Sequence, residues 1–415
     1  MSNSINNAAR STNSSNSVLR PDVDAPNMNG KINQTIERAC SWMVGSGAQV
    51  TSQDSNLNGG FVSWYEQDTQ LYAYVYSEIT GYMLTMLTSL YNRNNDVRYL
   101  NSAIRAGDWF LSTVHEPTGG FRCLFPLRET RFDYKREQIY AFDCGVILNG
   151  LVNLFRASKH PKYLAAATSV ADWLVRDVQK SSKGFYPVYD IGQDKFIESD
   201  KEWSLCSGSY HTKIALGLLN LYDLTRKSSY LRAVTNACDF ALEFQDKSGR
   251  FVSFPTTHGT NSHPHTYSAE GLWTVGKYLG REDYLQASAQ ATSWLLSMQN
   301  DEGIVPRHFQ SNEPLYNERV DVLAQALRMG AIHLAEGRLP KEVQPRLEKL
   351  VPIIARNQST SDDVRASGGF YFGRLSDGTV MPHVNVWVTM FAVQALSAYD
   401  DFKHGRYEFK PFDMV

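Results

Sequence analysis

The sequence predicts an all-α fold in which six helical hairpins close into a ring, an (α/α)6 toroid. Three observations lead to this prediction: a repeated helical unit, the alternation of an apolar helix with an amphipathic one, and two incomplete units near opposite ends of the chain that complement each other. Internal repetition of this kind is typical of architectures that stack one helical unit on the next.

The repeat is visible in four consecutive segments. Each contains a Tyr-Leu pair, and a large aromatic residue follows the tyrosine ten positions later. The four pairs are Tyr99 and Trp109, Tyr163 and Trp173, Tyr230 and Phe240, and Tyr284 and Trp294. A fixed internal offset in four segments indicates a repeated structural unit.

Within each unit the two helices differ in character. In the first unit, Ile79, Met83 and Leu87 belong to a helix that is apolar nearly all round, which is typical of a helix buried on every side. The next helix carries Leu100 and Ile104 on one stripe and polar residues elsewhere. Each unit is therefore expected to be an inner helix, a short turn and an outer helix.

The ring is expected to close through the two ends of the chain. A weaker unit begins at residues 317–334 and continues through residues 343–356. The segment 383–401 then reads as an inner helix with no outer helix after it, whereas residues 31–44 read as an outer helix with no inner helix before it. Together they complete a sixth hairpin. An open solenoid would instead need polar caps at both ends. Residues 119–129 and 184–190 are expected to form short β-hairpins at the rim.

Composition narrows the class of protein. The chain has 415 residues, and 41 basic residues nearly balance 43 acidic ones, which does not favour nucleic acid or an anionic membrane as a partner. No apolar run is long enough to span a membrane. The five cysteines are widely spaced, without a CxxC pair, as in a reducing compartment. Residues 1–30 are rich in Asn and Ser and are expected to be a disordered tail before a single toroid domain over residues 31–415. A cytoplasmic protein is expected; nothing in the sequence indicates an oligomeric state.

These segments resemble the six-hairpin glycosidase-type superfamily. The run from "SEITGYMLTML" through "FDCGVILNGLVNLF" to "YHTKIALGLLNLY" is similar to a family of toroid proteins encoded among bacterial and archaeal polysaccharide-biosynthesis genes. The resemblance covers about residues 32–400 and implies a sugar or glycan substrate. More remote relatives include unsaturated glucuronyl hydrolases, sugar 2-epimerases and the helical domain of uronyl C5-epimerases, so the fold alone does not select a reaction.

The candidate site follows from the ring itself. The amino-terminal ends of the inner helices should converge on one face, where polar residues would line a common funnel and the helix ends would favour a bound anion. Glu78, Asp143, His211 and Tyr267 lie at or near such ends and are the predicted catalytic residues. Glu78 and Asp143 are the predicted acid/base groups. Each could equally serve as a first-turn acid or a cap for its helix.

Further residues near the same helix ends are predicted to bind substrate. They are Tyr76, Tyr82, Arg122, Trp203, Tyr210, His263, His265, Glu270, Arg307, Asp321 and Asn385. Arg122 and Arg307 follow outer helices and could hold a sugar carboxylate, although each could also be a solvated surface charge.

No cofactor is expected. His263 and His265 flank a proline, but the local pattern offers no third metal ligand, so no metal site is predicted. There is no P-loop and no GxGxxG signature.

Three functions remain open. Acid/base epimerisation or isomerisation of a sugar is favoured by the histidines and tyrosines of the funnel and by the expected cytoplasmic location. Glycoside hydrolysis would use the carboxylate pair. A glycan-binding protein without catalysis would instead show no strongly perturbed carboxyl pKa.

Overall fold

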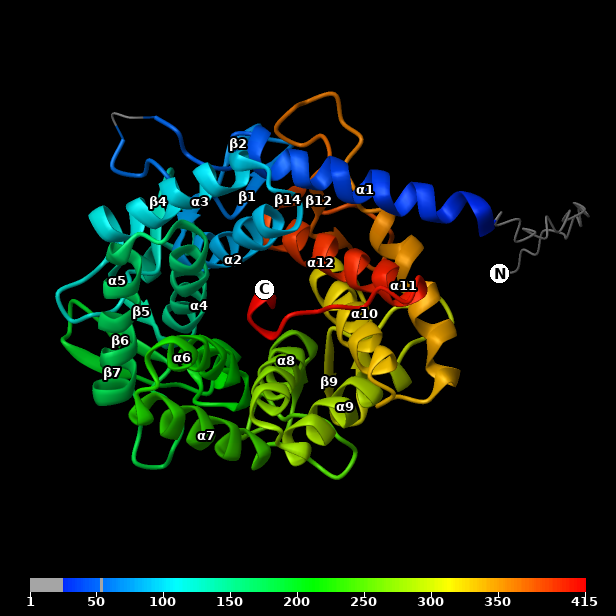
Figure 1. Cartoon of the computed structure of the whole chain (residues 1–415). Helices are drawn as coiled ribbons and strands as arrows, with labels where there is room; N and C mark the ends of the chain where they lie inside the picture. Colours follow the sequence, from blue (N-terminus) through cyan, green and yellow to red (C-terminus); the bar gives the residue numbers. More distant parts are fainter. Residues whose placement is uncertain (1–24, 53–54) are drawn as a thin grey trace, which may run out of the picture.

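The computed structural model describes residues 25–52 and 55–415. In these residues twelve α-helices form a closed ring, with short strands in the connecting loops, which confirms the predicted (α/α)6 toroid (Figure 1). No helix in the described part of the chain combines the length and the apolar character that a membrane crossing requires.

The helices form two concentric layers. The inner helices are α2 (Ser77–Asn94), α4 (Ala141–Ser158), α6 (Thr212–Thr225), α8 (Ser262–Leu279), α10 (Val320–Ala335) and α12 (Val386–Lys403). The outer helices are α1 (Ala25–Gly45), α3 (Val97–Trp109), α5 (Pro161–Trp173), α7 (Ser228–Leu242), α9 (Glu282–Ser297) and α11 (Gln344–Ala355). Each inner helix packs against the next, and α12 packs against α2 and α1, so the predicted sixth hairpin is present. The core lies between the two layers.

The first helix begins earlier than expected. Residues 25–30, predicted to belong to a disordered tail, are part of α1, so the prediction is wrong for them. Pro26 near the start of this helix is compatible with the helical backbone, because the first-turn N–H groups have no acceptor within the helix. The rest of the predicted tail, residues 1–24, lies outside the described residues.

The repeated tyrosines link neighbouring outer helices. The hydroxyl of Tyr163 donates to Asp108 at 2.8 Å, and that of Tyr230 donates to Asp172 at 2.6 Å. Tyr284 makes the same bond to Asp239 at 2.6 Å. Each aspartate directly precedes the large aromatic residue of the preceding unit, so the recurring tyrosine and aromatic residue mark one partly buried contact between successive hairpins.

A second recurring contact closes the ring. Glutamines after the outer helices donate to a backbone carbonyl of the next outer helix: Gln179 to Ala233 at 3.1 Å, and Gln245 to Ala287 at 2.8 Å. Gln358, after α11, donates to the carbonyl of Thr35 in α1 at 2.8 Å. The junction between the two ends of the ring therefore uses the same bond as the other units.

Short strands lead into the inner helices. The strands are β1 (Trp64–Glu66), β2 (Leu71–Tyr72), β3 (Tyr74–Tyr76), β4 (Leu124–Pro126), β5 (Gln138–Tyr140), β6 (Val188–Asp190), β7 (Lys195–Ile197), β8 (Thr260–Asn261), β9 (His308–Gln310), β10 (Glu313–Leu315), β11 (Glu318–Arg319), β12 (Phe370–Tyr371), β13 (Gly373–Arg374) and β14 (His383–Asn385). Of these, β3, β5, β8, β11 and β14 end one residue before an inner helix, and the 3-10 turn η5 (Ser209–His211) precedes α6.

The strands pair in five small antiparallel groups. Their orders are β3-β4, β5-β6-β7, β8-β9-β10, β11-β13 and β12-β14-β1-β2. The expected hairpin in residues 184–190 involves β6 and β7, whereas residues 119–129 hold one strand, β4, which pairs with β3.

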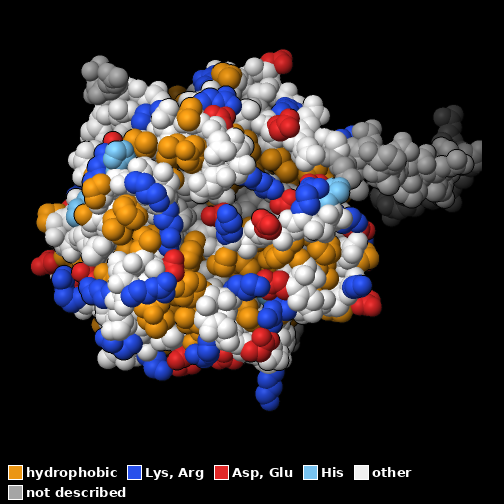
Figure 2. Space-filling view, in the orientation of Figure 1, with side chains coloured by type: hydrophobic (Ala, Val, Ile, Leu, Met, Phe, Trp, Pro, Cys, Tyr) orange, Lys and Arg blue, Asp and Glu red, His pale blue; other side chains and the backbone are white. Residues whose placement is uncertain are grey.

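The C-terminal segment closes one end of the ring. Residues 405–415 cross to the ring axis, where Met414 and Val415 are buried (Figure 1). The Phe412 carbonyl accepts hydrogen bonds from Asn149 and Asn153 of α4, at 3.1 and 2.9 Å. A cavity of about 710 Å³ lies between this segment, α2 and α12, and charged side chains of both signs surround the hollow on this face (Figure 2).

Candidate active site

A cavity of about 240 Å³ opens among the amino-terminal ends of the inner helices, at the other end of the ring axis from the C-terminal segment. Nine of the predicted residues line it: Tyr76, Glu78, Asp143, Trp203, Tyr210, His263, Tyr267, Arg307 and Asp321. They come from five of the six inner-helix entries and the loops beside them, so the ring brings together residues that are far apart in the sequence.

Glu78 and Asp143 form a carboxyl pair on this cavity. Burial raises the pKa of Glu78 to about 7. Burial, and then the charge of Glu78, raises the pKa of Asp143 well above its usual range. One carboxyl oxygen of Asp143 has no hydrogen-bond partner among the described residues. Burial and the repulsion between the two carboxyl groups thus favour a proton on the pair, and such a shared proton is the arrangement of an acid/base pair.

The alternative role of these two acids, helix capping, is not what the structure shows. The N-cap residues of α2 and α4 are Tyr76 and Tyr140, and neither helix has a side-chain cap. The Ser77 hydroxyl donates to the backbone carbonyl of Arg122 and does not cap α2. The carboxylates therefore lie in the first helical turn but point to the cavity, where the helix ends add positive potential.

Asp321 and His263 form a second polar group on the cavity. Asp321 is fully buried and pairs with the guanidinium of Arg319, with contacts of 2.5 and 3.1 Å. Burial alone would raise the pKa of Asp321, but the charge of Arg319 outweighs it and the pKa is lowered. The His263 Nδ1 atom lies 2.7 Å from Gln325 Oε1 and 3.6 Å from Asp321, and burial lowers the pKa of His263. The cavity thus holds an ionised carboxylate beside a neutral imidazole.

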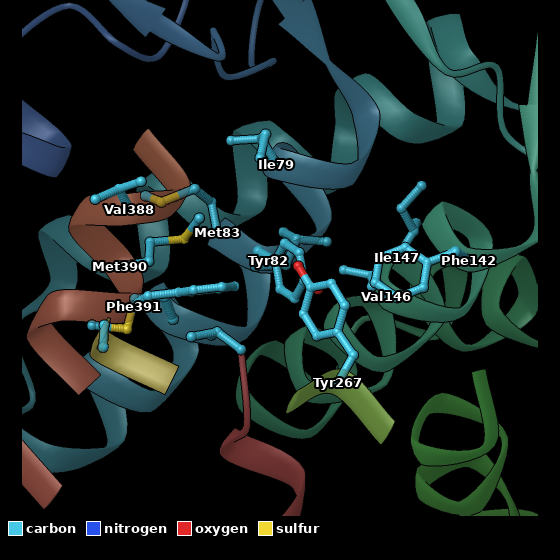
Figure 3. Close-up of a cluster of buried hydrophobic side chains, with 14 of the residues drawn as sticks. Ile79, Tyr82, Met83, Phe142, Val146, Ile147, Tyr267, Val388, Met390 and Phe391 are labelled. Atoms are coloured by element: carbon cyan, nitrogen blue, oxygen red, sulfur yellow. The ribbon is translucent and has the colours of Figure 1, made fainter. Parts of the chain in front are cut away.

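Aromatic rings form one wall of the cavity. The rings of Phe142 and Tyr267 are 4.9 Å apart, those of His263 and Tyr267 are 4.4 Å apart, and Trp203 contacts Tyr210 edge-on at 5.1 Å. Tyr267 reaches from α8 toward Tyr82 of α2, over apolar residues of α2, α4 and α12 (Figure 3). Aromatic faces and polar edges of this kind suit a ring-shaped polar ligand.

Two cations, Lys135 and Arg307, line the cavity beside its carboxyl groups. Lys135 lies in the 3-10 turn η2 (Asp133–Glu137) and Arg307 in the loop before β9. Burial alone would lower the pKa of Lys135, but nearby groups, Asp143 and Glu78 among them, outweigh burial and raise it. Burial and the charge of Arg319 lower the pKa of Arg307. Cations that line a partly buried cavity can bind an anionic ligand.

Two predicted residues occupy structural positions at the rim. Arg122 forms ion pairs with Glu116 at 2.8 Å and Glu137 at 3.3 Å, outside the cavity, so the prediction that it faces the funnel is wrong. Its neighbours Phe121 and Cys123 point inward and are fully buried, and alternate residues of an extended segment face opposite sides. Asn385 is the N-cap of α12 and accepts from the Val388 N–H at 3.3 Å.

Two predicted histidines also lie outside the cavity. His265 accepts from the Phe251 N–H through Nδ1 and faces the Ala291 carbonyl through Nε2, each at 3.1 Å, so it joins a loop to α9. His211 packs on Tyr210 and Phe185, and within the described part of the chain neither of its ring nitrogens has a hydrogen-bond partner. Tyr210 takes the cavity position at this helix entry, so the adjacent side chain of His211 points away from it.

Tyr82 and Glu270 lie below the cavity floor. Tyr82 is in the second turn of α2, beneath Tyr267, and Glu270 is fully buried in α8 with Lys213 and Arg328 as partners. They are too deep to touch a ligand and instead support residues that line the cavity.

Sequence reasoning missed several lining residues. They are Lys135, Tyr140, Asn261 and Arg319. Trp387 also lines the cavity, although a tryptophan within an inner helix is expected in the core. Lys135 comes from a highly charged loop with no counterpart in the other units. For Arg319, the Arg-x-Asp spacing at the start of α10 was an available signal.

The buried histidines are expected to make the protein sensitive to acid. Burial lowers the pKa of His211 to about 3, of His265 to about 4 and of His333 to about 3. In the unfolded chain these histidines take up protons near their ordinary pKa of 6.5, whereas in the folded chain they stay neutral at that pH. The stability of the fold therefore decreases as pH falls from about 6.5 to about 4.

A His211→Phe protein should show this dependence more weakly. Phe suits the aromatic surroundings, and relative to the wild type we expect a gain of about 2 kcal/mol near pH 5. Near pH 8, where His211 is neutral in both states, this pH-dependent part of the gain should be absent. Urea unfolding at both pH values measures the difference, and an equal difference at both would contradict the assignment.

Comparisons with known proteins identify the fold. No protein-family profile and no curated protein sequence matches the chain. Among solved structures, cellobiose 2-epimerase from Bacillus thermoamylovorans is similar, with a TM-score of 0.72 and 13% identity over 88% of this chain and 99% of that chain. D-mannose isomerase has a TM-score of 0.70 and 10% identity over 91% and 99% of the two chains.

Unsaturated glucuronyl hydrolase from Bacillus sp. GL1 is also similar, with a TM-score of 0.62 and 15% identity over 87% of this chain and 96% of that chain. At these identities the likeness shows the fold alone. It agrees with the (α/α)6 toroid described above.

Proposed function

We propose that this protein is a carbohydrate-acting enzyme that uses Glu78 and Asp143 as an acid/base pair on a sugar carrying a carboxylate. One observation carries the proposal: two carboxyl groups, each with a raised pKa, line one cavity. Such pairs divide the tasks of donating a proton and of activating water. A non-catalytic binding site has no need of a buried carboxyl near its titration midpoint.

Cleavage of a glycosidic bond is the reaction that this pair favours. Protonated Asp143 would donate its proton to the substrate, and ionised Glu78 would accept one from water or act on the sugar directly. Lys135 and Arg307 would hold the sugar carboxylate, and Trp203 and Trp387 would pack against the ring. The similarity in fold to an unsaturated glucuronyl hydrolase is consistent with this choice. A cytoplasmic location is part of the proposal, because it suits the balanced charge and unpaired cysteines.

Epimerisation is the second candidate. His263 is the one described histidine that lines the cavity, and its ring lies against that of Tyr267. The imidazole of His263 and the hydroxyl of Tyr267 would then act on a bound sugar together. The sugar epimerase and isomerase among the structures of similar fold support this alternative. With His211 and His265 away from the cavity, the carboxyl pair has the stronger support.

Product analysis separates the two reactions. The protein would be incubated with an unsaturated glucuronyl disaccharide, its saturated counterpart, cellobiose and mannose, and the products examined by mass spectrometry and NMR. Two smaller sugars indicate cleavage, and a changed sugar of unchanged mass indicates epimerisation. No change in any of these, together with no binding, would contradict the proposal.

Arg307→Gln is expected to weaken binding of the acidic sugar. Losing one charge-assisted hydrogen bond of about 1.5–3 kcal/mol should raise KM roughly 10- to 100-fold. Neutral sugars should be affected little. Arg122→Gln is the matched control, because Arg122 is a partly exposed arginine paired with Glu116 outside the cavity. Equal effects of both substitutions would exclude Arg307 as the carboxylate-binding group.

A further inference from the structure

A buried polar network lies directly below the cavity floor. Glu270 is fully buried in α8, and its carboxylate receives Lys213 Nζ of α6 at 3.1 Å and the guanidinium of Arg328 of α10. The side-chain amide of Gln325 is also within reach, with Nε2 at 3.2 Å from Glu270 Oε1. Burial alone would raise the pKa of Glu270, but Arg328 and then Lys213 outweigh it and lower the pKa, so Glu270 is ionised.

An ionised Glu270 fixes the direction of the Gln325 amide. A carboxylate can only accept hydrogen bonds, so the amide group that faces it must be the NH₂ group. The carbonyl oxygen of Gln325 must then point the other way, toward His263. The buried ion pairs thus determine which end of the amide meets the imidazole.

The amide in turn fixes the protonation of His263. Its Nδ1 lies 2.7 Å from Gln325 Oε1, and a carbonyl oxygen can only accept, so Nδ1 carries the hydrogen. In a neutral imidazole the other nitrogen then has a free lone pair. Asp321, at 3.6 Å from Nδ1, is beyond direct hydrogen-bond range, while Trp203, Tyr267 and Phe391 pack around the ring and hold its plane.

We infer that Gln325 is a positioning residue: Glu270 and its ion pairs orient the Gln325 amide, and the amide oxygen holds His263 in the tautomer with the hydrogen on Nδ1. In this tautomer Nε2 accepts a hydrogen from the bound sugar. The inference rests on the proposed function, because it assumes that the cavity takes a sugar. His263 then accepts a hydrogen bond, or a proton, from a sugar hydroxyl or from water, and it does not donate one. The charged groups around it are Asp321, Arg319 and Glu270.

Nitrogen NMR of protein labelled in its histidine rings tests this directly. The His263 signals are assigned from their loss in a His263→Gln protein. We expect the wild type, near neutral pH, to show a protonated Nδ1 and an unprotonated Nε2. A protonated Nε2 would overturn the inference. This measurement uses the wild type and the His263→Gln protein alone, so it does not depend on whether the Gln325 variant folds.

The Gln325→Met protein provides a second test, by the His263 nitrogen shifts and by turnover. Met keeps the volume but removes the acceptor, so both His263 nitrogens are expected to move toward averaged shifts, with turnover of the acidic sugar falling about 10-fold or more. Gln394→Met is the matched control, because Gln394 is a buried glutamine that contacts Arg328 but not His263. Unchanged His263 shifts in Gln325→Met, or the same change in the control, would overturn the inference. The predicted tautomer without turnover of any sugar would contradict the proposed function alone.

Discussion

Glu78→Gln is expected to lower turnover of the acidic sugar by about 100- to 10,000-fold, with little change in KM. Gln has the same shape but cannot exchange a proton, so the loss reports the acid/base step. The same substitution should stabilise the protein above neutral pH. The folded chain keeps the Glu78 proton up to a pKa of about 7, whereas the unfolded chain releases it near 4.5, so the carboxyl group lowers stability as pH rises through that window.

The stability gain and its control make this prediction specific. We expect Glu78→Gln to gain about 3 kcal/mol near pH 8 and little near pH 4. Glu116→Gln is the control, because Glu116 pairs with Arg122 outside the cavity and should leave turnover unchanged. Kinetic assays and urea unfolding at both pH values measure the two effects. Full turnover by Glu78→Gln would rule out its acid/base role.

Arg328→Met is expected to destabilise the protein by about 3–5 kcal/mol. Both Arg328 and Glu270 are fully buried, and removing the arginine leaves Glu270 with Lys213 as its remaining cation. Adding Glu270→Gln to the variant should recover part of the loss, because the uncompensated charge is then absent.

Urea unfolding of the single and double variants measures this difference. Arg98→Met is the control, since Arg98 pairs with Asp96 at an exposed position, where an ion pair contributes about 1 kcal/mol or less. A loss of stability of similar size in Arg98→Met and Arg328→Met would contradict the prediction that breaking the buried Arg328–Glu270 pair costs more than breaking an exposed ion pair.

The ring could be predicted from the sequence because the repeat has a physical cause. Tyr163 and Tyr230 recur since each donates to an aspartate of the preceding outer helix, and the all-apolar helices recur since each is buried on every side. The hydrogen bonds from glutamines to the next outer helix are equally regular. They could not be predicted, because these glutamines lie in loops whose sequences differ from one unit to the next.

The candidate site was predictable where an inner helix begins and less so elsewhere. The ring geometry brings Glu78, Asp143 and His263 together. It does not determine which of two adjacent residues points to the cavity, as Tyr210 and His211 show. Lys135 lies in a loop found in one unit alone, so no pattern could indicate its place.

The closing contact between Gln358 and Thr35 joins residues 323 positions apart. Contacts of such long separation form slowly, because a long loop must be ordered before the contact stabilises anything. On the ribosome, α1 leaves the exit well before α12 is made, and domains of this size fold through intermediates. During synthesis the apolar face of α1 is therefore exposed until α12, the inner helix it packs against, has been made. Until then, the nascent chain exposes apolar surface that can aggregate.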